Sequence, residues 1–137
     1  MTTINATKKD FVNLVNGIYK VQNLEGKKLA IVASKNLAIL QENLKDIEEA
    51  GKPSSEFMEV AKKVNEIAQA DSEDAKEQIE AIEKENEALI KERNEQIETL
   101  ESMMDQELSL DLHTISEDDL PESINTTQIS ALIKIIE

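Results

Sequence analysis

Apolar residues recur along most of this chain at spacings of three and four, which predicts a mainly helical protein. Thr7 and Asp10 have the spacing of a capping box, with Asp in place of Glu. Apolar residues follow at helical spacing, so a first helix is expected over about residues 8–22. A second is expected over about 27–50, where the apolar positions form a narrow seam suited to a partner helix. Gly51 and Pro53 should end it.

The segment 54–107 contains neither Gly nor Pro and continues the same apolar spacing. Ser54 or Ser55 can cap it. As a single helix it would be roughly 80 Å long. The four polar residues 71–74 weaken the seam and could cap a fresh helix, so one helix and two helices broken near 71 both remain open. The seam beyond this point consists of Ile79, Ile82, Asn86, Leu89, Arg93, Ile97 and Leu100.

This seam predicts a coiled coil, with its acidic residues facing outward. Asn86 and Arg93 occupy positions where polar groups cost stability but can specify register and oligomeric state. A lone helix of this composition would be marginal, because helices in proteins are stabilised mainly by packing an apolar face. The seam therefore needs a partner helix, either from the N-terminal half or from another copy of the chain.

Two short strands are expected outside the helices. Leu108, Leu110 and Leu112 alternate with polar residues, which indicates a half-buried strand over about 107–115. Residues 2–5 are its candidate partner. After a loop, Thr126 or Thr127 should cap a last helix over about 127–136, which should dock on the first helix.

Together these elements predict a mainly α-helical fold: a long helical hairpin or coiled coil with a small two-stranded β element at its base. We expect one elongated domain over residues 1–137. Aromatic residues make up only 2% of the chain. Because aromatic side chains usually anchor compact cores and pockets, their scarcity favours elongated helix pairs over a globular enzyme.

Charge is distributed unevenly. The net charge is −14, and residues 71–107 hold fourteen acids against four bases. Such a segment repels nucleic-acid phosphates, so no direct nucleic-acid binding is expected. It either attracts a basic protein or serves only as a solvated face. The candidate partner-binding acidic face consists of Glu80, Glu83, Glu87 and Glu95.

Residues with catalytic or ligand-binding chemistry are scarce. The chain has no cysteine and one histidine, His113, which is expected on a strand surface. Residues 117–119 are consecutive acids in a loop and are expected to be solvated. Nucleotide-binding, zinc-protease and EF-hand motifs are missing. We therefore expect no catalytic, cofactor or metal site. Without an apolar leader or a long apolar run, the chain is expected in the cytoplasm and away from membranes.

Three segments resemble small proteins of unknown function encoded by tailed bacteriophages. They are TTINATKKDFVNLVN, EGKKLAIVASKNLAILQENLKDIEE and LSLDLHTISEDDLPESINTTQISALIKIIE. The resemblance implies a phage origin, a host-cytoplasmic location and a non-enzymatic role, and it implies no site residues.

The expected function is that of a small accessory or assembly protein that acts through protein–protein interaction. It is expected to form a homo-oligomer and to bind an unidentified, basic protein. Two other functions remain open. One is an acidic inhibitor of a nucleic-acid-binding host or defence protein, in which the acids mimic phosphates. The other is a structural component of the virion.

Overall fold

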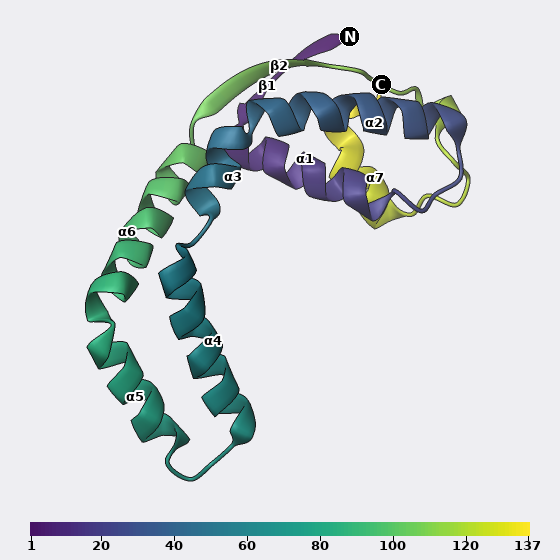
Figure 1. Cartoon of the computed structure of the whole chain (residues 1–137). Helices are drawn as coiled ribbons and strands as arrows, with labels where there is room; N and C mark the ends of the chain where they lie inside the picture. Colours follow the sequence, from purple (N-terminus) through teal and green to yellow (C-terminus); the bar gives the residue numbers. More distant parts are fainter. The chain divides into compact units, whose positions relative to one another are not determined.

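The computed structural model describes all 137 residues, and it confirms a mainly helical chain with one two-stranded antiparallel sheet (Figure 1). In chain order the elements are β1 (Thr2–Thr7), α1 (Lys8–Lys20), α2 (Lys27–Asn43), α3 (Lys45–Gly51), α4 (Ser55–Ala70), α5 (Ala75–Glu85), α6 (Glu87–Met104), β2 (Glu107–Leu112), the 3-10 turn η1 (Glu117–Asp119), α7 (Thr126–Leu132) and the 3-10 turn η2 (Ile133–Ile135).

The chain packs as two compact units, a division that the prediction of one domain over 1–137 did not anticipate. Unit 1 comprises Met1–Ile47 and Ser102–Glu137, and unit 2 comprises Glu48–Glu101. Every buried hydrophobic side chain except Val60 belongs to unit 1. Unit 1 therefore has a hydrophobic core of its own, which is the physical basis of a separate domain.

The core of unit 1 is built around α1. Phe11, Leu14 and Ile18 follow one another at helical spacing and are all buried. Against this stripe pack α2 and, as the sequence predicted, α7 (Figure 1). The predicted capping box is also present: the Thr7 hydroxyl accepts from the Asp10 N–H, and the Asp10 carboxylate accepts from the Thr7 N–H.

The two strands pair as expected, although their bounds differ from those predicted. β1 extends past residue 5 to Thr7, and β2 ends at Leu112, three residues early. Thr2 lies opposite Leu112 and Thr7 opposite Glu107. Beyond Leu112 the chain has no β1 residue left to pair with, so strand pairing stops there.

The helices of the middle segment are shorter than predicted. The helix expected over 27–50 is interrupted at Leu44, and Asp46 Oδ1 accepts from the Ile47 N–H at 2.9 Å at the start of α3. The segment 54–107 is broken at residues 71–74, where Asp71 is left-handed (φ 48°), and again at Asn86. Asp tolerates that conformation better than most residues. The first of these breaks was one of the two open alternatives, and the second was not predicted.

The first and last helices also differ at their ends. α1 ends at Lys20 rather than 22, and α7 is capped by Asn125 rather than Thr126 or Thr127. The Asn125 side chain accepts from the Gln128 N–H at 2.9 Å, and the Gln128 side chain accepts from the Asn125 N–H at 3.0 Å. This reciprocal pair satisfies two backbone donors, which neither threonine does here.

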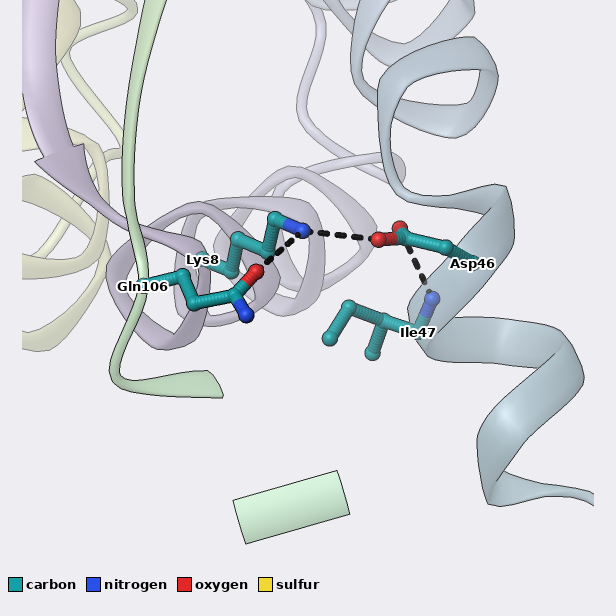
Figure 2. Close-up of polar contacts among 4 residues, drawn as sticks. All are labelled: Lys8, Asp46, Ile47 and Gln106. Carbon is teal, nitrogen blue, oxygen red and sulfur yellow. Dashed lines mark hydrogen bonds and ion pairs between the residues drawn. The ribbon is translucent and has the colours of Figure 1, made fainter. Parts of the chain in front are cut away.

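Lys8 joins three segments of unit 1 (Figure 2). Its ammonium donates to Asp46 Oδ2 at 2.7 Å and to Gln106 Oε1 at 3.0 Å, while its backbone N–H donates to the Gln106 carbonyl at 2.9 Å. The hydrogen bond from Lys8 is the main cause that lowers the pKa of Asp46. Because the Asp46 side chain remains 46% exposed, the ion pair orients the segments more than it stabilises them.

A fully buried polar side chain, Asn36, joins α2 to the end of β2. Asn36 Nδ2 donates to the His113 carbonyl at 2.8 Å, and Asn36 Oδ1 accepts from the His113 N–H at 2.7 Å. The amide thus reproduces the two bonds that a neighbouring strand would make. Both polar groups of the His113 backbone are satisfied as β2 leaves the sheet.

The C-terminal segment is held against the same region by backbone bonds. The Ile115 N–H donates to the Ile135 carbonyl at 2.8 Å, and the Glu137 N–H donates to the Ile115 carbonyl at 2.9 Å. α7 approaches α1 most closely at Gly17, where a Cβ atom would lie 2.8 Å from the Ala131 carbonyl oxygen. The contact between the two helices therefore requires glycine at position 17.

We expect Asn36→Leu to lower the free energy of unfolding by about 1–3 kcal/mol, because it leaves the backbone N–H and C=O groups of the half-buried His113 without their Asn36 partners. Urea denaturation followed by circular dichroism measures this. Asn43→Ala is the control on the same helix, because Asn43 is exposed and bonds only to the Ile39 carbonyl. Equal losses for the two variants would contradict the role assigned to Asn36.

Gly17→Ala and Gly51→Ala should have opposite effects on the free energy of unfolding. At Gly17 the new methyl group would also lie 2.9 Å from the Ala131 Cβ. The clash should cost about 1–3 kcal/mol. At Gly51 a Cβ meets only Leu100 Cδ2, at 3.6 Å. The higher helix propensity of alanine should then stabilise by up to about 1 kcal/mol. Thermal unfolding of both variants checks the difference in sign.

Candidate protein-interaction surface

An open groove runs along unit 2, with α4 on one side and α5 and α6 on the other. Its volume is about 550 Å³. The apolar residues that line it are Phe57, Val60, Ala61, Val64, Ala68, Ile90 and Ile97. Only Val60 among them is buried, at 9% exposure, whereas Ile97 is 37% exposed. A hydrophobic surface of this kind on a helical unit is a candidate interaction site.

The groove follows directly from the pattern of α4. Phe57, Ala61, Val64 and Ala68 recur at steps of four and three, so they form one stripe along three turns. Ser54 starts the helix by accepting from the Phe57 N–H at 3.1 Å. The alanines are small and exposed. They leave space above the helix that larger side chains would fill.

An acidic hollow of about 390 Å³ adjoins the groove. It is lined by Glu80, Glu83, Lys84, Glu87 and Ile90. Glu83 and Ile90 line both features, so the hollow and the groove form one continuous surface. The three glutamates are exposed, and none forms an ion pair. Lys84 compensates only part of their charge.

A polar cluster contacts one end of the groove. Gln96 Nε2 donates to the carbonyl oxygens of Ala50 at 2.8 Å and Lys52 at 2.7 Å, which occupies acceptors left free where α3 ends. Gln96 Oε1 accepts from Arg93 Nη1 at 2.8 Å. The Arg93 guanidinium lies 6.0 Å from the centroid of the Phe57 ring, within the range of a cation–π contact. Gln96 thereby orients a cation over the aromatic ring.

The turn between α4 and α5 is organised by Asp74. Gln78 Nε2 donates to Asp74 Oδ2 at 2.7 Å. Hydrogen bonds from the side chains of Ser72 and then Gln78 lower the pKa of Asp74. The turn lets α4 pack against α5, which places the apolar stripe of α4 along the groove.

The predicted seam residues occupy different environments within unit 2. Ile79, Ile82, Leu89 and Leu100 are half-buried. Leu89 lines a small hollow with Phe57 and Arg93, and Leu100 lies opposite Gly51. Arg93 and Ile97 line the groove. Asn86 is half-buried, and its Nδ2 donates to the Ile82 carbonyl of its own helix at 2.9 Å.

The predicted acidic face is brought together only in part. Glu80, Glu83 and Glu87 surround the same hollow, whereas Glu95 does not line it. All four side chains are exposed. The spacing of three and four residues keeps the first three on one face, although the break at Asn86 separates Glu83 from Glu87. Glu95 lies eight residues beyond Glu87 on the same helix, α6, and this spacing turns it by about 80° around the helix axis.

Sequence reasoning missed Ile90 and the polar residues Asn65 and Gln96. Ile90 lies off the seam, but it stands seven residues from both Glu83 and Ile97, and all three line the groove. That repeat of seven was a usable signal. Gln96 carried no signal, because its partners are backbone carbonyls that lie more than forty residues earlier in the chain.

No protein-family model, curated protein or solved structure matches this chain. No helix combines the length and the apolar character needed to cross a membrane. No group of three or more acidic, histidine or cysteine side chains is placed to hold a metal ion.

We expect Asn86→Leu to raise the thermal stability of unit 2. The substitution removes the side-chain amide that competes for the Ile82 carbonyl, and it adds an apolar residue between Ile82 and Leu89. The gain should be about 1 kcal/mol or less. Far-ultraviolet circular dichroism during thermal unfolding measures it. A loss of stability would show instead that the bend at Asn86 is required for packing.

Proposed function

We propose that this protein is a non-enzymatic accessory or assembly factor of the kind encoded by tailed phages, and that it acts by protein–protein interaction through unit 2. The observation that supports this most directly is the lack of a core in unit 2. Val60 is the one buried hydrophobic side chain between Glu48 and Glu101. α5 and α6 bury no side chain at all.

These helices nevertheless have the apolar spacing of packed helices. A helix gains most of its stability from burying such a face. In unit 2 the face is only half covered, and the groove along α4 stays open. A partner that covered it would remove apolar surface from water, which is the main favourable term in protein association. The three segments that resemble phage proteins support the accessory role.

In this proposal the long helical segment acts as a coiled coil that also joins copies of the chain. Self-association would use the seam residues outside the groove, Ile79 and Ile82 among them. Their acidic neighbours remain at the edge of the contact. Salt therefore screens repulsion between copies and leaves the apolar contact intact.

One observation favours a second function, the inhibition of a nucleic-acid-binding protein. Glu80, Glu83 and Glu87 lie together around one hollow without ion-pair partners. A cluster of exposed carboxylates can meet a basic surface that normally contacts phosphates. Such binding would weaken steeply as salt is added.

We expect sedimentation equilibrium at high micromolar concentration to give a mass above the 15.3 kDa of one chain, and the association to persist in high salt. Ile82→Ser should shift the equilibrium toward the monomer. Glu98→Ser, at an exposed position of α6, is the control. A 15.3 kDa species at every concentration and salt level would remove self-association from the proposal.

A further inference from the structure

The groove of unit 2 has the dimensions and the walls of a helix-binding site. From Phe57 to Ala68 it follows three turns of α4, roughly 16 Å. Both walls are helices, and a third helix laid between two others is a common way to fill such a groove. Two exposed alanines, Ala61 and Ala68, mark the places where larger side chains of an incoming helix fit.

The chemistry of the occupant follows from the two features that share Glu83 and Ile90. The groove is mainly aliphatic, so it selects an apolar face of Leu, Ile or Met. Along one edge it continues into the hollow of Glu80, Glu83 and Glu87. The incoming helix therefore meets excess negative charge on the flank beside this hollow. Lys or Arg at that flank is complementary, whereas Asp or Glu is repelled.

We propose that the groove binds an amphipathic helix of a different protein, with an aliphatic face in the groove and Lys or Arg along the flank beside Glu80, Glu83 and Glu87. This inference rests on the proposed function, since it names the class of partner that unit 2 recognises. Affinity comes from the apolar face, and the charged flank sets the orientation and the rate of association.

A second copy of the chain is a poorer occupant for two reasons. If α5 or α6 of another copy docked in the groove, its own glutamates would lie near Glu80, Glu83 and Glu87 and would be repelled. Two helices combine aliphatic residues with three lysines, α1 and α2, but Leu14 of α1 and Leu29 and Leu40 of α2 are buried in unit 1. Either helix would have to leave its own core in order to bind.

The test uses the full-length protein and a labelled synthetic helix of about four turns, roughly 14 residues. One face carries leucines and one flank carries lysines. A matched peptide has glutamine in place of each lysine. Fluorescence anisotropy should show that the lysine peptide binds about tenfold more tightly than the glutamine peptide at low salt, and that the advantage fades at high salt.

Two substitutions of alanines in α4 test whether the peptide binds in the groove. Ala61→Lys fills the groove, and Ala70→Lys adds the same side chain at an exposed position two and a half turns away, on the opposite face. Both change the net charge equally. Ala61→Lys should weaken binding by about tenfold, and Ala70→Lys by less than about threefold. Circular dichroism verifies that both variants stay folded.

Two sets of glutamine substitutions test the charged flank. Replacing Glu80, Glu83 and Glu87 should slow association of the lysine peptide severalfold. Replacing Glu56, Glu59 and Glu66, which are exposed on α4 away from the groove, removes the same charge and should have little effect. Equal effects of the two triple variants would mean non-specific attraction and would overturn the inference.

Other outcomes also overturn it. Equal binding to the Ala61→Lys and Ala70→Lys variants would place the peptide outside the groove. Loss of self-association in sedimentation equilibrium when the lysine peptide is added in excess would identify a second copy as the occupant. If neither peptide binds but the protein still self-associates in sedimentation equilibrium, this inference fails and the proposed function stands.

Discussion

The paired hydrogen bonds between Asn36 and His113 are the contact on which the fold of unit 1 depends. A two-stranded sheet leaves the chain without a ladder partner as soon as one strand ends, and buried backbone groups cannot remain unpaired. The Asn36 amide supplies both bonds at His113. Two residues later the backbone of Ile115 pairs with the C-terminal segment. The chain therefore leaves the sheet with the backbone N–H and C=O groups of both His113 and Ile115 paired.

The two units use amphipathic helices in opposite ways. In unit 1 the apolar stripe of α1 is covered by α2 and α7, and close packing requires glycine at position 17. In unit 2 the stripe of α4 is covered on one side only and borders an open groove. The first arrangement gives a closed core, and the second leaves apolar surface available for binding. This contrast is the reason that we propose unit 2 as the interaction site.

Part of the candidate site could be predicted from the chain alone. Glu80, Glu83 and Glu87 were expected on one face, because their spacing is helical whatever the helix packs against. Glu95 was assigned to the same face, but it does not line the hollow, because a spacing of eight residues from Glu87 turns it by about 80° around the helix. Ile90 was missed because the seam was counted along one line of the helix. The groove combines Ile90 with the seam residues Arg93 and Ile97.

The sequence by itself determined the helical class, the cap at Thr7, a cap at Ser54 or Ser55 and the acidic character of the second half. Each of these depends on local spacing or on composition, which tertiary contacts do not alter. The pairing of the chain ends could also be predicted, because only two segments had the pattern of a strand. Only the tertiary structure decided that the chain forms two units, and that Asn36 is buried. The reason is that a side chain's burial and its hydrogen-bond partners depend on residues distant in sequence. Asn36 and His113 are 77 positions apart, and no local pattern connects them.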